Sequence, residues 1–135
     1  MTINEAIRKM KEDWSEPRDQ VAVGEMAPMA FACLFSEEAA NENNFAVLKL
    51  VLPPALLQFW KITRWARLFQ DCTYGQWGLE ILSPTESIEE TRKQRELRQD
   101  AYEINDLVVG RFIGDSDLLT RLRLRPTRHG CAADQ

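Results

Sequence analysis

The chain has 135 residues, of which 44% are hydrophobic and 28% are charged, which is typical of one compact domain with a core of its own. Its formal net charge of -4 lacks the positive field with which nucleic-acid-binding proteins displace counterions from phosphate, so we expect no nucleic-acid partner. The longest apolar stretch, residues 26–35, is far shorter than the ~20 residues that cross a membrane, so we expect a soluble protein with no membrane partner.

The first predicted element is an amphipathic helix that ends near Pro17. Charged residues fill one of its faces, and apolar side chains recur on the other at three- and four-residue spacing: Ile3, Ile7, Met10 and Trp14. The next segment, residues 21–35, is apolar but is interrupted by a glycine and a proline. This segment predicts only an irregular or partly extended structure.

Two more helices are predicted in the first half of the chain. Ser36, followed by Glu37 and Glu38, is typical of an N-cap with acidic residues at the positive end of the helix dipole, and it predicts a helix that runs to about residue 47. In residues 52–63 a proline fits the first helical turn, where its missing N–H has no partner anyway. The side chains that share one face predict that this third helix is buried: Leu52, Leu56, Phe59, Trp60 and Thr63.

Beyond residue 63 the apolar pattern changes from a helical period to a period of two. Alternating side chains predict a strand in residues 77–82, and a shorter strand is predicted in residues 67–71. The two strands form a predicted hairpin whose loop contains Tyr74 and Gly75. Residues 83–86 then read Ser-Pro-Thr-Glu, a capping box that predicts a helix toward residue 99.

This fourth helix carries few apolar side chains, and the last strands follow it. Only Ile88 and Leu97 are apolar between residues 86 and 99, so we expect the helix to project from the domain or to fray. Two strands, residues 107–113 and 118–124, are predicted around a Gly-Asp-Ser-Asp turn. We expect a single domain in residues 1–125 and a disordered tail in residues 126–135, where hydrophobic side chains almost disappear.

The order of these motifs resembles the SUKH superfamily, which includes the yeast Smi/Knr cell-wall regulators and many bacterial toxin-immunity proteins. The similarity covers roughly residues 36–124. It consists of a helix led by Leu52-Pro53, then Tyr74-Gly75 and the segment 77–82, and finally the strand, Gly-Asp-Ser-Asp turn and strand within residues 106–119. The last block is the most characteristic part of the resemblance.

The resemblance implies an α+β fold, with a mostly antiparallel sheet of about four or more strands and helices packed on one face. It implies a protein-binding module that neutralises a toxin domain, often a nuclease, and it brings no catalytic residues and no cofactor. The alternative is a regulatory scaffold or signalling adaptor of the Smi/Knr type. In both cases the partner is a protein, and the chain is expected not to be an enzyme.

Two departures from the family pattern predict differences in structure. Where the family usually has Asn-Gly after the proline-led helix, this chain has Arg64-Trp65, so the turn is expected to differ or to be strained. Family members usually continue past the last strand with another strand and a closing helix, whereas residues 125–135 here carry no such pattern. We therefore expect an open sheet edge, through which the chain can form a homodimer.

Residues that could be catalytic or could bind a metal are better explained by ordinary structural roles. Asp115 and Asp117 can reach one divalent ion, but a Gly-Asp-Ser-Asp segment is ordinary turn chemistry and hard cations need more oxygen ligands, so no metal site is expected. A nucleophilic pair of Cys72 or Cys131 with His129 requires the tail to fold over the domain. The scattered cysteines predict no disulfide framework, and no secretory signal is visible, so a cytoplasmic location is expected.

The candidate partner-binding residues combine aromatic and acidic side chains. We interpret Trp60 and Trp77 as core residues because each lies on an apolar face, whereas Trp65 stands between two arginines in a connection and is a candidate interface residue. Tyr74 in the hairpin loop is a second aromatic candidate. Carboxylates on or beside strands and turns are candidates for contact with a basic toxin, although each is equally well an ordinary surface acid: Asp71, Glu80, Asp115 and Asp117.

Overall fold

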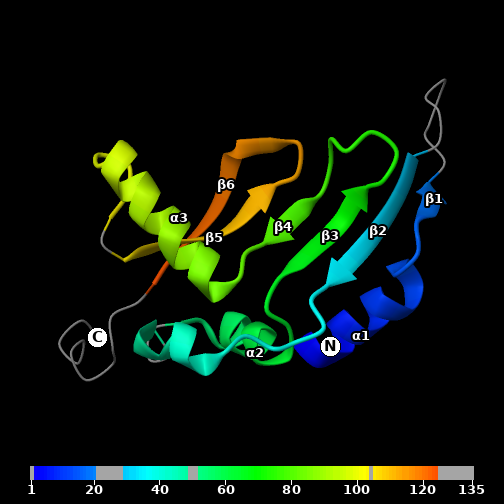
Figure 1. The fold of residues 1–135 in the computed structure, drawn as a ribbon, viewed down its shortest axis with the longest axis horizontal. Helices are drawn as coiled ribbons and strands as arrows, with labels where there is room; N and C mark the ends of the chain where they lie inside the picture. The colour runs from blue at the N-terminus through cyan, green and yellow to red at the C-terminus, as the bar shows by residue number, and fades with distance from the viewer. Residues whose placement is uncertain (1, 21–28, 49–51, 104, 125–135) are drawn as a thin grey trace.

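The computed structural model describes residues 2–20, 29–48, 52–103 and 105–124. Within them the chain forms three α-helices, two short 3₁₀-helices and six strands (Figure 1). In chain order these are α1 (Ile3–Trp14), β1 (Arg18–Gln20), β2 (Met29–Phe35), η1 (Glu42–Asn44), η2 (Ala46–Leu48), α2 (Pro54–Ile62), β3 (Ala66–Asp71), β4 (Leu79–Ile81), α3 (Pro84–Leu97), β5 (Asp106–Phe112) and β6 (Asp115–Arg123). None of the helices in these ranges has the length and apolar character needed to cross a bilayer.

The six strands form one sheet in the order β1-β2-β3-β4-β5-β6, and every neighbouring pair is antiparallel. The predicted α+β class with a mostly antiparallel sheet is therefore confirmed. The predicted hairpin is formed by β3 and β4, and the predicted last two strands are β5 and β6. The part of the segment 21–35 that the structure describes is the regular strand β2, whereas residues 21–28 lie outside the described residues, as does the predicted tail.

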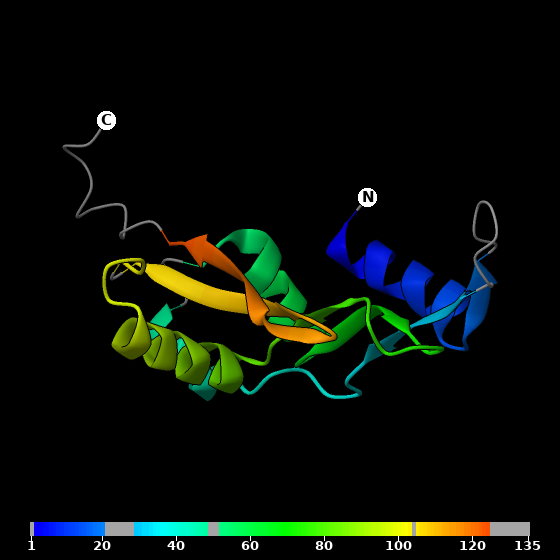
Figure 2. The same ribbon diagram turned by 90° about the horizontal axis from the view of Figure 1, so that it is seen from above.

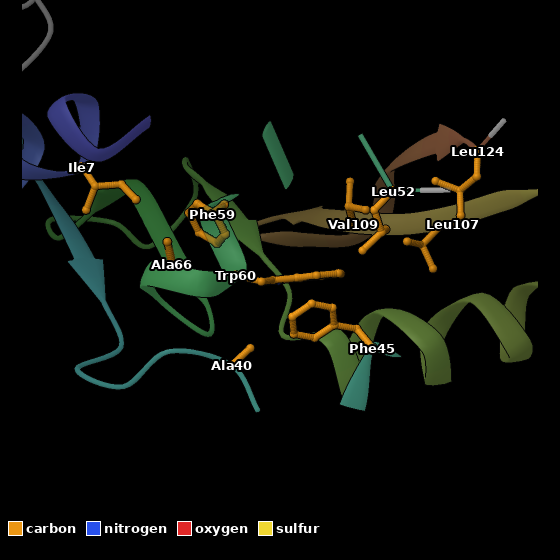
Figure 3. Close-up of a cluster of buried hydrophobic side chains, with 10 residues drawn as sticks. All are labelled: Ile7, Ala40, Phe45, Leu52, Phe59, Trp60, Ala66, Leu107, Val109 and Leu124. Atoms are coloured by element: carbon orange, nitrogen blue, oxygen red, sulfur yellow. The ribbon is translucent and has the colours of Figure 1, made fainter. Parts of the chain in front are cut away.

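The core lies between one face of the sheet and the helices α1 and α2, which Figure 2 shows on the same side of the strands. Helix α1 is capped by the Thr2 side chain, which accepts a hydrogen bond from the Glu5 N–H. Helix α2 begins directly after Pro53 and buries Phe59 and Trp60. The buried apolar side chains of the core are shown in Figure 3: Ile7, Ala40, Phe45, Leu52, Phe59, Trp60, Ala66, Leu107, Val109 and Leu124.

Helix α3 is the exception to the expected packing of the helices on one face. Arg67, Glu80 and Arg111 are paired across β3, β4 and β5. The neighbouring pair, Ala66 and Ile81, faces the core, and successive side chains of a strand point to opposite faces of the sheet. These three charged side chains therefore face the side of the sheet opposite the core. Arg111 lies 3.9 Å from carboxylate oxygens of Glu86 and Glu90 on α3. Helix α3 therefore covers the opposite face beside β5, as Figure 2 also shows.

The expectation that α3 projects or frays is wrong. Its buried residues are Pro84, Ser87, Thr91 and Gln94, and it packs against β5. Apolar side chains are few in this helix, but it attaches to β5 through hydrogen bonds between its side chains and the backbone of the strand. The predicted capping box of Ser83 and Glu86 is confirmed.

The prediction of a helix from Ser36 to residue 47 is also wrong, because the Ser36 hydroxyl binds the segment after α2 and does not cap a helix. Ser36 is buried, and its hydroxyl accepts from the Arg64 N–H at 2.7 Å and lies 2.9 Å from the Thr63 hydroxyl. It thus joins the end of β2 to the segment that follows α2. Residues 36–41 are irregular, and between residues 36 and 48 the only helical turns are η1 and η2.

The turns at two further places differ from expectation. The β5–β6 connection is Ile113-Gly114, and Asp115 already pairs with Phe112, so the turn is shorter than the predicted Gly-Asp-Ser-Asp segment. At Arg64-Trp65 the turn is not strained, because Phe69 is the one non-glycine residue with positive φ in the described ranges. Neither Arg64 nor Trp65 is therefore held in the left-handed conformation that an Asn-Gly turn uses.

Candidate functional site

Two connections emerge side by side at one end of the sheet. In a wholly antiparallel sheet β3 and β5 run in the same direction, so the β3–β4 loop, residues 72–78, and the β5–β6 turn, Ile113-Gly114, leave the sheet at the same end (Figure 1). The Ile113 N–H donates to the Gly78 carbonyl oxygen at 3.0 Å, so the two connections are in contact. We call these two connections and the strand ends that adjoin them, residues 68–79 and 112–120, the loop end.

Glycine is required where the two connections meet. Gly114 has φ +93°, and a Cβ atom there would lie 2.7 Å from the carbonyl oxygen of Gln76. A larger residue would therefore push the β5–β6 turn away from the β3–β4 loop. The close approach of the two backbones makes the loop end one packed unit.

Asp71 holds the β3–β4 loop in its conformation. Its carboxylate is only 1% exposed and accepts hydrogen bonds from the N–H groups of Thr73 at 2.9 Å, Tyr74 at 2.8 Å and Gln76 at 3.1 Å. Loss of solvent around Asp71 acts to raise the pKa of its carboxyl group, but the backbone N–H groups of the loop outweigh this and the pKa is lowered. Asp71 is thus an internal clamp, and its burial contradicts the predicted contact with a partner.

The loop presents its aromatic side chains to solvent. Tyr74 is 55% exposed and Trp77 is 61% exposed. The interpretation of Trp77 as a core residue is wrong, because Gly78, with φ +127°, turns the chain between Trp77 and the first residue of β4, so the alternation of the strand does not extend back to Trp77. Phe112 and Leu118, from the ends of β5 and β6, are also exposed.

The loop end carries carboxylates and no basic side chain of its own, and the arginines that border it, Arg67 and Arg111, are paired with Glu80. Residues 68–79 and 112–120 contain no Lys, Arg or His, although the chain has 17 Lys and Arg in all. Asp115 and Asp117 are both exposed, and the Asp117 N–H donates to the Asp115 carboxylate at 3.1 Å, which fixes the local backbone. Two of the four predicted acidic residues therefore lie on the surface of the loop end, to which Tyr74 and Trp77 also belong.

Glu80 lies in a shallow depression on the sheet face opposite the core. The depression has a volume of about 440 Å³ and is lined by Arg67, Gln70, Glu80, Arg111, Phe112, Ile113 and Gly114. The Glu80 side chain is 17% exposed and is 3.0 Å from Arg111 and 3.8 Å from Arg67. Because both carboxylate oxygens face arginines of its own chain, Glu80 contributes little free negative charge to a partner.

Trp65 lies away from the other predicted site residues, just before the first residue of β3. The Arg67 guanidinium stands 5.7 Å from the centre of its ring. Its backbone oxygen accepts hydrogen bonds from the Ser36 N–H and the Thr63 hydroxyl, so the segment is held firmly. The predicted site residues therefore divide into three places: the loop end, the sheet face beside it with Glu80, and a separate half-buried Trp65.

The strand β6 forms one edge of the sheet, as the dimer prediction requires. Arg111 pairs with Leu119, but the next residue, Phe112, pairs with Asp115, so residues 116–118 stand between two successive pairs. Figure 1 shows the bend that this irregularity gives to β6. The rest of the edge, residues 119–123, faces a second register shift between Val108 and Gly110 of β5, and dimerisation through this edge stays a prediction.

The sequence did not identify Trp77, Phe112 and Leu118 as surface residues, although the glycine after Trp77 is the signal that could have done so. In the described ranges no three His, Cys, Asp or Glu side chains come together as possible metal ligands. Cys72 is exposed, whereas His129 and Cys131 lie outside the described residues. Comparisons with protein-family models, curated proteins and solved structures found no significant match.

Proposed function

We propose that the chain is a protein-binding module that neutralises a toxin domain by covering its active surface, as the resemblance to the SUKH immunity proteins implies. The observation that carries the proposal is the loop end, where Tyr74 and Trp77 are exposed on a backbone that Asp71 holds in place. Trp and Tyr are the side chains that most often dominate interface energies. An anchor that is already ordered loses less conformational entropy when its partner binds.

Charge supports a nuclease as the class of toxin. A nuclease presents a cationic surface to its substrate, and exposed carboxylates such as Asp115 and Asp117 complement such a surface. Neutralisation by covering requires no reactive group from this chain, only a surface that excludes the substrate. The proposed location is the cytoplasm, where such a toxin finds nucleic acid.

A regulatory scaffold is the second candidate function, and Trp65 favours it. Trp65 has the residue type of an interface anchor and precedes β3, at the end of that strand opposite the loop end. Two separate surfaces suit a protein that links two partners, whereas neutralisation by covering requires only one.

Capture of the partner followed by a growth assay separates the two functions. The tagged full chain is used to capture partners from its native host, and each partner is then expressed in a surrogate cell with and without the chain. Neutralisation predicts that the partner alone stops growth and that co-expression of the chain restores it. Partners that are harmless alone, with two different ones bound to the chain at once, would favour the scaffold instead.

A further inference from the structure

The loop end differs from the rest of the molecule in both charge and exposed apolar area. It has no basic side chain, although basic side chains are frequent elsewhere in the chain. Its exposed side chains are two aromatic residues, two carboxylates and the apolar ends of β5 and β6: Tyr74, Trp77, Phe112, Asp115, Asp117 and Leu118. Large exposed apolar side chains rimmed by charge mark surfaces that bind other proteins.

We propose that the loop end is the docking surface for a cationic protein surface that contains an apolar cleft. Tyr74 and Trp77 enter the cleft, and Asp115 and Asp117 lie against its basic rim. This inference rests on the proposed function and deepens it, because it assigns the binding surface and the chemistry of the partner.

The anchors are prepared for binding by the packing beneath them. The Asp71 carboxylate bonds to the N–H groups on both sides of Gly75, and the Asp71 N–H donates to the Trp77 carbonyl oxygen at 2.9 Å. The loop is thereby closed upon itself, and the Gly78–Ile113 hydrogen bond ties it to the neighbouring turn. Tyr and Trp each have only two side-chain torsions, so large contact areas are gained at a small cost in entropy.

The rim carboxylates act on the rate of encounter. In the described residues neither Asp115 nor Asp117 forms an ion pair, and Arg111, the nearest basic residue of β5, is paired with Glu80 instead. Uncancelled surface charge raises the association rate with a partner of opposite sign and is screened by salt. The anchors, in contrast, act mainly on the dissociation rate.

A second copy of the chain is a poorer occupant than a cationic protein. An isologous dimer places the same surface of each copy against the other. Two loop ends would then bring Asp115 and Asp117 of both copies together with no Lys or Arg in residues 68–79 or 112–120 to compensate. Like charges opposed in this way disfavour the contact.

The probe for this inference is a phage-displayed library of random peptides, panned on the full chain and counter-selected on Trp77→Ala. Selected peptides are expected to combine Lys or Arg with apolar residues. Trp77→Ala and Tyr74→Ala are each expected to weaken their binding by about 10-fold or more, chiefly through faster dissociation. Leu97→Ala removes an equally exposed apolar side chain from α3 and is expected to leave binding unchanged.

The charge contribution is measured with a double variant, Asp115→Asn with Asp117→Asn. It is expected to slow association several-fold at about 0.01 M salt, where the Debye length is about 30 Å, and to have almost no effect at about 1 M, where it is about 3 Å. Glu89→Gln with Glu96→Gln changes the net charge equally on the exposed face of α3, and it is expected to change association much less. Thermal melting of every variant confirms that it is folded.

The other outcomes overturn the inference. The inference is contradicted if the selected peptides bind the loop-end variants as well as the wild type, or if they lack basic residues. It is also contradicted if panning enriches no peptide that prefers the wild type to Trp77→Ala. A dimer in light scattering that Trp77→Ala dissociates assigns the surface to a second copy and also contradicts it. Its failure is distinguishable from that of the proposed function, because a toxin neutralised equally well by the loop-end variants removes only the assignment of this surface.

Discussion

Helices α2 and α3 are attached to the same sheet by different interactions. Helix α2 buries Phe59 and Trp60, and the Trp60 ring packs on Phe45 with 5.5 Å between ring centres. Helix α3 buries only a proline and the polar side chains of Ser87, Thr91 and Gln94. Its two large apolar side chains, Ile88 and Leu97, are exposed.

A polar helix can dock on a sheet where the backbone of the strand beside it lacks hydrogen-bond partners. β4 pairs with β5 only at residues 110–112. Beyond that point the Thr91 hydroxyl accepts from the Val108 N–H at 2.8 Å, and the Arg95 side chain donates to the Asp106 carbonyl oxygen at 2.8 Å. Unpaired backbone groups in a buried place are costly, so side chains that satisfy them stabilise the docked helix. The two attachments should therefore respond differently to substitution and to pH.

Loss of the apolar attachment is expected to have the largest effect. Trp60→Ala empties a fully buried site and removes the hydrogen bond from the indole Nε1 to the Leu82 carbonyl oxygen. It should lower the free energy of unfolding by about 3–5 kcal/mol. Urea denaturation measures this loss, and Trp77→Ala, which removes an exposed tryptophan, should cost less than about 0.5 kcal/mol. Equal losses in the two variants would contradict the burial of Trp60.

The second-largest effect is expected from acid, which should destabilise the polar region around Asp106. The hydrogen bond from Arg123, with the Glu103 N–H and the charges of Arg123 and Arg121, lowers the pKa of Asp106 from 3.8 to about 2 against the opposing effect of burial. Since the pKa is lower in the folded state, the stabilisation is complete above the unfolded value and is lost as pH falls from about 4 to about 2.

Thermal melting of wild type and Asp106→Asn across this range tests the linkage. The wild type should melt higher at neutral pH, and the difference should shrink steadily below about pH 4. Asp106→Glu, which retains a charge, serves as the comparison that should keep the acid sensitivity. A difference that is constant from neutral pH to about pH 2 would show that the carboxylate charge does not stabilise this region.

Removal of the Thr91 hydroxyl is expected to lower the free energy of unfolding by a smaller amount. Thr91→Val keeps the shape of the side chain but leaves the buried Val108 N–H without its partner. It should cost roughly 1–3 kcal/mol of stability, whereas Thr91→Ser retains the hydroxyl and should cost less. Hydrogen exchange at Val108 provides a local measurement. Protection of that amide that is unchanged in Thr91→Val would separate the docking of α3 from this bond.

The start of α3 should give the smallest of these effects. The Ser83 hydroxyl accepts from the Glu86 N–H at 3.2 Å, and the Glu86 side chain accepts from the Ser83 N–H at 3.4 Å. Ser83→Ala should cost about 1 kcal/mol, as expected for loss of an N-cap. Glu86→Gln keeps an acceptor and should cost less. Circular dichroism during urea denaturation measures both, and an equal loss in the two would place the stabilisation in the charge of Glu86 rather than in the cap.

Elements with local signals could be predicted from the sequence. The apolar spacing of α1 lies within the helix itself, and the proline before α2 and the capping box of α3 lie at the first turn of the helix that they specify, so residues close in the chain decide these elements. The period of two and the glycine-containing loop likewise specified the β3–β4 hairpin. For the candidate site, Tyr74, Asp115 and Asp117 were chosen from loop chemistry, and the structure places all three on the surface.

The contacts between these elements depend on the tertiary fold and could not be predicted from local sequence. The hydroxyl of Ser36 is used by Thr63 and Arg64, far along the chain, so its local resemblance to a helix cap is not realised. The docking of α3 depends on strand-backbone groups that remain unpaired because β4 is short. The loop end exists because β3 and β5 run the same way in the sheet, which brings residues about forty positions apart into contact. Such pairings depend on the position of the whole backbone in space, which the identity of neighbouring residues does not specify.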